Sequence, residues 1–147
     1  ALHDARVMTV RGDNNMLWFG TRGGGLGRLN VDTQQIDYFV HEPENPKSLS
    51  FNGVTSVFPD NAGNVWVGTF GGGVNYLPAG SKDFVHYRFD ENNPRSLNSD
   101  RVLAVYQLLD GTMSINQRTL IVYRHPWRGL SIKTQKRNCG SARKVVG

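Results

Sequence analysis

Short apolar segments separated by turns run through the first 113 residues. They are rich in β-branched side chains and are bounded by Asp, Asn and Gly, a pattern typical of strands joined by tight turns. No segment shows the 3.6-residue spacing of an amphipathic helix, so the fold class is predicted to be all-β. In the first repeat the predicted strands are residues 7–11, Met16–Thr21 and Leu26–Asn30, with a fourth strand around Tyr38 and Phe39. In the second repeat they are residues 54–58, 64–69 and Val74–Leu77, with a fourth strand around Phe84 and Tyr87.

These strands belong to a sequence repeat with an offset of 48 residues. Residues 17–21, followed by a glycine triplet, return as residues 65–69 with a second triplet, and the loop Asn-Pro-Lys-Ser-Leu at 45–49 returns as Asn-Pro-Arg-Ser-Leu at 93–97. Four strands in a repeat of roughly 40–50 residues are typical of a β-propeller blade. We therefore predict a propeller fragment with blades at 1–52 and 53–100 and the start of a third blade at 101–113.

Two tryptophans occupy equivalent positions in the middle of the second strand of each repeat. A four-stranded blade cannot bury both of its faces alone, and a large aromatic ring contributes most where two blades meet. Trp18 and Trp66 are therefore predicted to lie between neighbouring blades. Propellers close with at least about four blades, so the predicted fragment leaves two open sides.

The repeat pattern stops at Ser114. The positions equivalent to Trp-Val-Gly-Thr at 66–69 read Ser-Ile-Asn-Gln at 114–117, and no third glycine triplet follows. Residues 114–147 carry 8 Lys and Arg and no acidic residue, whereas residues 1–113 carry 9 Lys and Arg against 12 Asp and Glu. The sequence thus predicts an irregular basic tail at 114–147, either a non-native continuation or a divergent edge blade or disordered segment.

Composition narrows the possible chemistry. The single Cys139 excludes an internal disulfide and any multi-cysteine zinc site, and the four histidines show no short pairing typical of metal ligands. No catalytic residues, metal or cofactor are therefore predicted, and the chain itself is not expected to be an enzyme. The apolar runs are too short to span a bilayer, so no membrane contact is expected in this segment. The basic tail could attract nucleic acid, but no recognition motif supports that partner.

Candidate ligand-binding residues come from the topology of an up-and-down blade. The loop before the first strand and the turn between the second and third strands are expected on the same side of the propeller, where ligands commonly bind. Arg22 and Phe70 occupy the one variable position beside the repeated Thr and glycines of these turns, and Asn52, Ser99 and Asp100 lie where a first strand begins. The sequence predicts these five residues as candidate ligand contacts.

The repeat resembles a known family. Leu17-Trp-Phe-Gly-Thr-Arg-Gly-Gly-Gly-Leu26 and Val65-Trp-Val-Gly-Thr-Phe-Gly-Gly-Gly-Val74, with the Asn-Pro-x-Ser-Leu loop, are similar to the two-component regulator propeller repeat over about residues 5–113. This resemblance implies the periplasmic sensor region of a bacterial hybrid histidine kinase, or of a related diguanylate cyclase. It also implies a receptor dimer in the parent protein and a small ligand such as an oligosaccharide.

The predicted function is thus a fragment of an extracytoplasmic ligand-sensing propeller in two-component signal transduction, with no chemistry of its own. Its expected partners are a small-molecule ligand and the neighbouring blades of the parent chain. The alternative is a protein-interaction propeller that is not linked to a kinase. A propeller enzyme would need clustered His and carboxylates, which the two repeats do not show.

Overall fold

Three antiparallel sheets of four strands each make up the fold. The structure, a computed structural model, describes residues 6–116, 120–124 and 131–135. In each sheet the strands follow chain order, as in a meander. The first sheet contains β1 (Val7–Asp13), β2 (Met16–Thr21), β3 (Leu26–Asn30) and β4 (Ile36–Phe39). The second contains β5 (Val54–Pro59), β6 (Val65–Thr69), β7 (Val74–Leu77) and β8 (Val85–Tyr87), and the third contains β9 (Ala104–Gln107), β10 (Met113–Asn116), β11 (Leu120–Arg124) and β12 (Ser131–Gln135).

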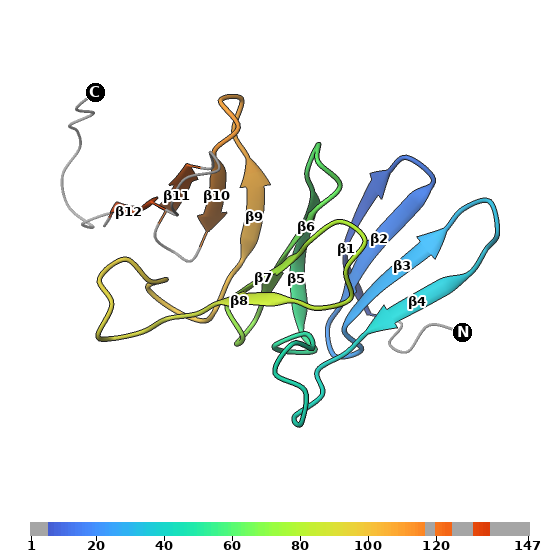
Figure 1. Ribbon diagram of the computed structural model, residues 1–147, viewed down its shortest axis with the longest axis horizontal. Helices are drawn as coiled ribbons and strands as arrows, with labels where there is room; N and C mark the ends of the chain where they lie inside the picture. The colour runs from blue at the N-terminus through green and yellow to red at the C-terminus, as the bar shows by residue number, and fades with distance from the viewer. Residues whose placement is uncertain (1–5, 117–119, 125–130, 136–147) are drawn as a thin grey trace.

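The sheets stand side by side as successive blades of a propeller (Figure 1). The first strands of the blades, β1, β5 and β9, contact one another in turn. The hairpins β1–β2, β5–β6 and β9–β10 lie at the upper edge in Figure 1, and the long loops that join one blade to the next lie at the lower edge. The predicted all-β propeller fragment is confirmed. No helix of membrane-spanning length and apolarity occurs in the described part of the chain.

Two apolar cores hold the three blades together, one at each junction. Trp18 of β2 is 5% exposed and shares a core with Val54 and Val57 of β5. Trp66 of β6 is 3% exposed and lies in the second core. This core also contains Val105 of β9 and Val102, which lies just before β9. Both tryptophans therefore pack between neighbouring blades, as predicted.

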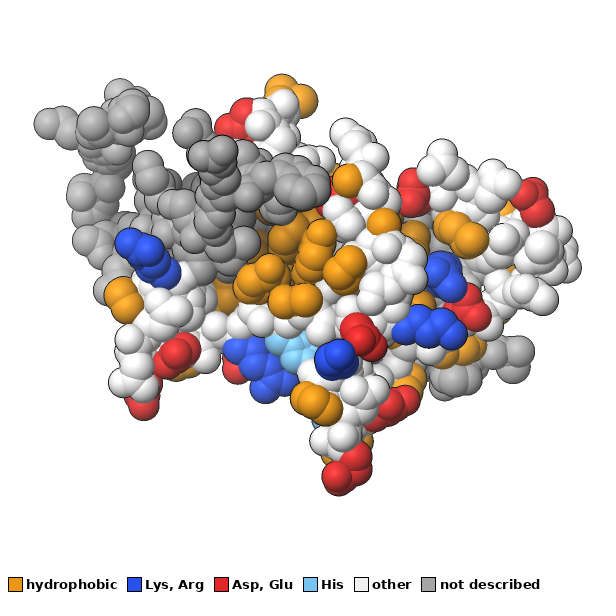
Figure 2. Space-filling model, viewed as in Figure 1, with side chains coloured by type: hydrophobic (Ala, Val, Ile, Leu, Met, Phe, Trp, Pro, Cys, Tyr) orange, Lys and Arg blue, Asp and Glu red, His pale blue; other side chains and the backbone are white. Residues whose placement is uncertain are grey.

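The outer strands of the second blade carry two half-buried tyrosines, Tyr76 in β7 and Tyr87 in β8. In Figure 2, apolar side chains gather at the centre of the face shown, with charged side chains around them. In this blade the rings of Tyr76 and Tyr87 are partly buried, and they lie 4.6 Å and 6.1 Å from the ring of Trp66. Burial raises the pKa of the Tyr87 hydroxyl, and burial with the negative charge of Asp60 raises that of Tyr76. Both hydroxyls therefore stay protonated at neutral pH.

The region predicted as an irregular tail contains three strands. β10, β11 and β12 pair in order beside β9, so the described part of residues 114–135 completes a third four-stranded sheet. Two properties of the sequence account for this difference. Met113 and Ile115 alternate on the face that joins the second core, and Leu-Ile-Val-Tyr at 120–123 has high β-propensity. Residues 117–119, 125–130 and 136–147 lie outside the described residues, and the proposal that the sequence after Ser114 is non-native stays a prediction.

Glycine near the end of β2 and β6 lets the next blade approach closely. A Cβ atom on Gly20 would lie 2.3 Å from Cγ1 of Val54, and one on Gly68 would lie 2.8 Å from Cγ1 of Val102. Both valines are fully buried in the junction. The glycine of the Trp-x-Gly-Thr motif is therefore a packing residue, because any side chain would occupy space that belongs to the next blade.

We expect the variant Gly20→Ala to lose about 1–3 kcal/mol of stability, because the added methyl overpacks the junction against Val54. Chemical denaturation monitored by tryptophan fluorescence would measure the loss. Gly12→Ala is the matched control, since no atom lies within 4 Å of a Cβ at Gly12. Equal stability of the two variants would contradict this packing role.

Candidate functional site

The turns between the second and third strands are built in the same way in both complete repeats. The hydroxyl of Thr69 donates to the carbonyl of Gly73 at 2.9 Å and accepts from the amide of Gly72 at 2.9 Å. The hydroxyl of Thr21 makes the equivalent bonds to Gly25 and Gly24. Gly73 has a φ of 74°, and a Cβ there would lie 2.2 Å from the carbonyl oxygen of Tyr87. Only the glycine backbone fits this position without strain.

Each turn is hydrogen-bonded to the loop that leads into the next blade. The amide of Gly25 donates to the carbonyl of Asn52 at 2.9 Å, and the amide of Gly73 donates to the carbonyl of Asp100 at 2.8 Å. In addition, the amide of Phe70 donates to the carbonyl of Gly53 at 2.9 Å. The turns and the inter-blade loops therefore lie on one side of the propeller, as the blade topology predicted. We call this side the loop face.

Asn52 and Asp100 also use their side chains inside the protein. The Oδ1 atom of Asn52 accepts from the amide of His41 at 2.7 Å, and Oδ1 of Asp100 accepts from the amide of Phe89 at 2.7 Å. Both bonds close the inter-blade loop across 11 residues. These two predicted ligand residues thus fix the loops in position, through equivalent atoms in the two repeats.

The other predicted residues lie at two successive blade junctions. Arg22 is exposed at the first junction. At the second junction Phe70 is half-buried, and the guanidinium carbon of Arg101 lies 5.9 Å from the centre of its ring. The hydroxyl of Ser99 accepts from the amide of Arg101 at 3.0 Å. The structure therefore brings Phe70, Ser99 and Asp100 together around Arg101, while Arg22 and Asn52 belong to the neighbouring junction.

Two residues of the loop face were not predicted from the sequence. Phe51 is 43% exposed, and its ring lies against the turn, 3.4 Å from where a Cβ of Gly71 would be. Arg101 stacks on Phe70 as described above. The repeat comparison carried the signal for both, because Phe51 stands where the next repeat has Ser99, and Arg101 stands where the previous repeat has Gly53.

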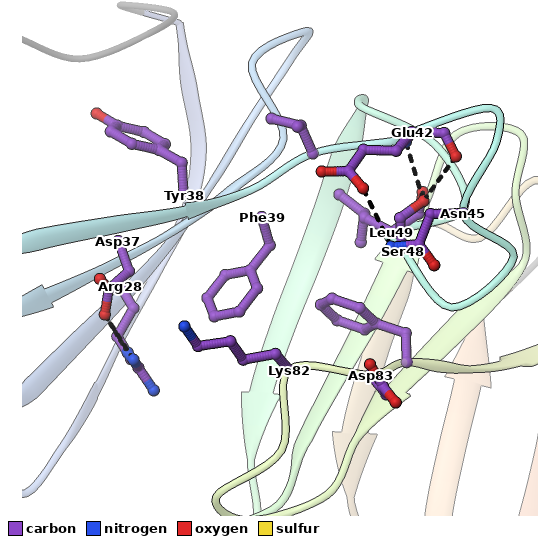
Figure 3. Close-up of a pocket in the computed structure, with 12 residues that line it drawn as sticks. Arg28, Asp37, Tyr38, Phe39, Glu42, Asn45, Ser48, Leu49, Lys82 and Asp83 are labelled. Carbon is purple, nitrogen blue, oxygen red and sulfur yellow. Dashed lines mark hydrogen bonds and ion pairs between the residues drawn. The ribbon is translucent and has the colours of Figure 1, made fainter.

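A pocket of about 310 Å³ lies between the outer strands of the first blade and the connection before β8 (Figure 3). Its apolar part contains Phe39, which meets the ring of Phe84 edge to face at 5.7 Å. Arg28 and Asp37 form an ion pair of 2.5 Å in its wall, and Lys82 extends toward Phe39. The pocket is distinct from the loop-face residues predicted from the sequence, none of which lines it.

The histidines within the blades contact backbone carbonyls. Nδ1 of His41 lies 2.9 Å from the carbonyl of Leu49, and Nε2 of His86 lies 2.7 Å from the carbonyl of Ser48. Both rings hold the Asn-Pro-Lys-Ser-Leu loop against adjoining strands. Among the described residues, no group of three or more His, Cys, Asp or Glu side chains could hold a metal ion.

We expect Asp100→Ala to lower the free energy of unfolding by about 0.5–1.5 kcal/mol, because the amide of Phe89 would lose its hydrogen-bond acceptor. Asp100→Asn is the matched control. It keeps the Oδ1 acceptor and copies Asn52 of the preceding repeat, so its stability should stay near that of the parent. Urea denaturation of the three proteins measures the difference. A destabilised Asn variant, or an unaffected Ala variant, would contradict the assignment of Asp100 to holding the loop.

Comparison with known proteins relates this geometry to a family. The sequence model of the family described as "Two component regulator propeller" matches residues 48–71, which contain the end of the inter-blade loop, β5, β6 and the turn after it. A search of curated proteins finds no match.

Solved structures share the fold over most of the chain. The extracellular domain of the hybrid two-component system BT3049 from B. thetaiotaomicron is 24% identical, with a TM-score of 0.74 over 89% of this chain and 18% of that one. The extracellular domain of BT4673 from the same organism is 19% identical, with a TM-score of 0.63 over 86% of this chain and 15% of that one. An ancestral GH74 enzyme is 14% identical with a TM-score of 0.62 over 89% of this chain and 18% of that one.

The chain thus spans less than a fifth of the length of these structures. The matched segment runs from Ser48, near the end of the Asn-Pro-Lys-Ser-Leu loop, through the buried Trp66 to Gly71 in the Thr–glycine turn. Residues 48–71 thus match the two-component regulator propeller repeat, and the chain has the fold of a β-propeller fragment.

Proposed function

We propose that this chain is part of the extracytoplasmic, periplasmic ligand-sensing propeller of a two-component sensor. In this proposal its loop face contacts a small ligand of the oligosaccharide class, and the chain has no chemistry of its own. The observation that carries the proposal is the turn itself. Two identical Thr–glycine scaffolds hold different side chains, Arg22 and Phe70, at the same position of successive blades.

The side chains around the second Thr–glycine turn suit a sugar ligand. Phe51 and Phe70 offer partly exposed aromatic rings, on which the C–H face of a pyranose can pack. Arg101 is exposed beside Phe70, and Arg22 is exposed at the preceding junction, so both guanidinium groups can donate hydrogen bonds to hydroxyl or carboxylate groups. Apolar rings with a few oriented polar groups are the usual composition of a small-molecule site.

The remaining predicted residues support this surface. Because Asn52 and Asp100 already use Oδ1 and the backbone carbonyl within the protein, we assign them to positioning the loops that carry the ligand contacts. Ser99 lies between Asp100 and Arg101 in the same loop, and its hydroxyl accepts from the amide of Arg101. In this assignment a ligand touches Arg22, Phe51, Phe70 and Arg101, with Ser99 at the edge.

The sensor role rests on the family match and on the extracellular domains that share the fold. A ligand that binds one arrangement of the blades better than another would shift the population toward that arrangement. In the parent protein, proposed to be a dimer, this shift would bias a membrane-proximal output domain.

A protein partner on the loop face is the second candidate. It is favoured by exposed apolar side chains in and next to the inter-blade loops, where Phe51 is 43%, Phe89 is 50% and Leu103 is 40% exposed. Contiguous exposed apolar groups are typical of protein interaction sites. A ligand screen separates the two candidates, since a protein-interaction surface would show no saturable binding of oligosaccharides.

In the sensor that contains these blades, we expect the double variant Arg22→Ala/Phe70→Ala to bind its oligosaccharide at least about tenfold more weakly, a loss of about 1.4 kcal/mol. Isothermal titration calorimetry measures the affinity, and a transcriptional reporter measures the signal. Leu109→Ser is the matched control, because Leu109 is fully exposed in the β9–β10 turn, away from the loop face. Unchanged affinity and signalling in the double variant would overturn the proposed site.

Lys82→Ala tests the pocket at the outer strands in the same assay. Our proposal expects this variant to keep the parent affinity, because Lys82 lines the pocket and not the loop face. A tenfold loss in Lys82→Ala with no loss in the double variant would move ligand binding from the loop face to the pocket.

A further inference from the structure

The pocket at the outer strands lies between two blades that the structure describes completely, so its walls belong to this chain alone. One wall is formed by β3 and β4, and the opposite wall by residues 82–84, which precede β8. The amide of Phe84 donates to the carbonyl of Lys47 at 2.8 Å, which ties this wall to the inter-blade loop. The pocket measures about 310 Å³. Since an apolar cavity of about 150 Å³ accommodates benzene, there is room for one aromatic ring and its substituent.

The inner part of the pocket is apolar and aromatic. Leu49 is fully buried, Phe84 is 5% exposed, and Phe39 is half-buried. The rings of Phe39 and Phe84 meet edge to face, with their centres 5.7 Å apart. A flat aromatic ligand that covers these rings removes apolar surface from water and can stack or meet them edge to face.

Positive charge lies on one side of these rings. Nε and Nη2 of Arg28 both donate to Oδ2 of Asp37, at 3.1 Å and 2.5 Å, so the two charges neutralise each other. In the view of Figure 3, Lys82 extends past Phe39 toward the side of this ion pair. In the described part of the chain, no ion pair joins Lys82 to an acidic residue. Its ammonium group is therefore an uncompensated cation at the pocket.

Negative charge lies at the other end. In Figure 3, Glu42 lies with Asn45 and Ser48 on the opposite side of Phe39. Oε2 of Glu42 accepts from Nδ2 of Asn45 at 3.0 Å, and no described cation forms an ion pair with this carboxylate. A ligand with an anionic group at each end would be repelled here, whereas a single anionic group can bind at Lys82.

The charged wall is not part of the repeated scaffold. Arg28 lies opposite Trp18 of the neighbouring strand, and Tyr76 occupies this position opposite Trp66 in the second blade. The ring of Tyr76 packs 4.6 Å from that of Trp66, whereas the guanidinium carbon of Arg28 lies 5.5 Å from the centre of Trp18. The first blade thus holds a cation where the second holds an aromatic side chain, so blade packing alone does not require the charge.

We propose that this pocket is a second binding site, which takes a small aromatic monocarboxylate. The ring of the ligand lies on Phe39 and Phe84, and its carboxylate accepts charge-assisted hydrogen bonds from Lys82 beside the Arg28–Asp37 pair. Glu42 excludes a second anionic group from the far end. The site is separate from the loop face and does not depend on the proposed oligosaccharide or on the sensor role.

The test is an NMR titration of the complete ¹⁵N-labelled chain with 3-phenylpropionate. We expect saturable shifts of the amides at 37–40 and 82–84, with a dissociation constant below about 1 mM. 3-Phenylpropanamide has the same shape without the charge, and it should bind at least about fivefold more weakly. The dicarboxylate 3-(4-carboxyphenyl)propionate should bind more weakly by a similar factor because of Glu42.

Three variants of single residues identify the contacts. Lys82→Ala should weaken the binding of 3-phenylpropionate at least about fivefold, and Lys82→Arg should keep most of the affinity because it keeps the charge. Glu42→Gln retains an acceptor for Asn45 and should bring the affinity for the dicarboxylate close to that for 3-phenylpropionate. Arg95→Ala is the matched control, since it removes an exposed cation from the second inter-blade loop, which does not line the pocket, and should leave binding unchanged.

Several results would overturn the inference. The absence of saturable shifts up to about 10 mM 3-phenylpropionate, well above the expected dissociation constant, would show that the pocket does not take this class of ligand. Equal binding of the amide, or unchanged binding by Lys82→Ala, would show that the cation does not select the ligand. Shifts confined to Phe51, Phe70 and Arg101 would place the carboxylate on the loop face instead.

Discussion

The contact on which this structure depends is the close approach of one blade's glycine to the next blade's valine. A side chain at Gly20 or Gly68 would collide with Val54 or Val102, and the adjacent tryptophans bury most of their surface at the same junctions. A buried aromatic ring contributes most of its stabilisation through the apolar area removed from water. The Trp-x-Gly-Thr motif therefore combines, on one strand, a tryptophan that fills the junction and a glycine that leaves space for the valine of the next blade. This combination explains why it recurs at a fixed offset.

The last residue of that motif connects packing to the loop face. Thr21 and Thr69 are fully buried, and their hydroxyls fix the glycine turns from beneath. The turns in turn donate to the carbonyls of Asn52 and Asp100 at the start of the following blade. One continuous set of hydrogen bonds thus runs from the packed junction to the surface, so the variable side chains are displayed on a backbone that the junction holds in place.

The sequence predicted the strands correctly where the residues of a segment and its flanking turns are sufficient to define the strand. Met16–Thr21, Leu26–Asn30 and Val74–Leu77 form strands with the predicted bounds, because these short segments rich in apolar residues lie between turns that contain Gly, Asn and Asp. The third sheet was not predicted beyond its start, since the repeat had lost its tryptophan, glycine and threonine at 114–117. Pairing with β9 and burial of Ile115 sustain β10 without that motif.

The candidate site was predicted less well than the fold, for a physical reason. Asn52 and Asp100 are short polar residues at a strand start, and a sequence does not distinguish a side chain that binds a ligand from one that accepts a backbone amide 11 residues away. Phe51 and Arg101 differ from their repeat partners Ser99 and Gly53 in the sequence, but only the folded chain shows that Phe51 lies against the turn at Gly71 and that Arg101 lies over the ring of Phe70.

The two junction tryptophans also show how a small change in a turn alters the interior. Nε1 of Trp66 donates to Asp60 at 3.3 Å, whereas Nε1 of Trp18 is buried and has no hydrogen-bond partner. The turn that follows Asp13 is one residue shorter than the turn that follows Asp60, so the carboxylate does not reach the indole in the same way. An unsatisfied buried donor costs about 1–3 kcal/mol. The ring of Trp18 is instead covered by Arg28, whose guanidinium carbon lies 5.5 Å from its centre. The first blade therefore carries the less satisfied tryptophan, and its strand β1 is also the less buried one, because Val7 and Val10 are 40% and 44% exposed whereas Val54 and Val57 of β5 are fully buried.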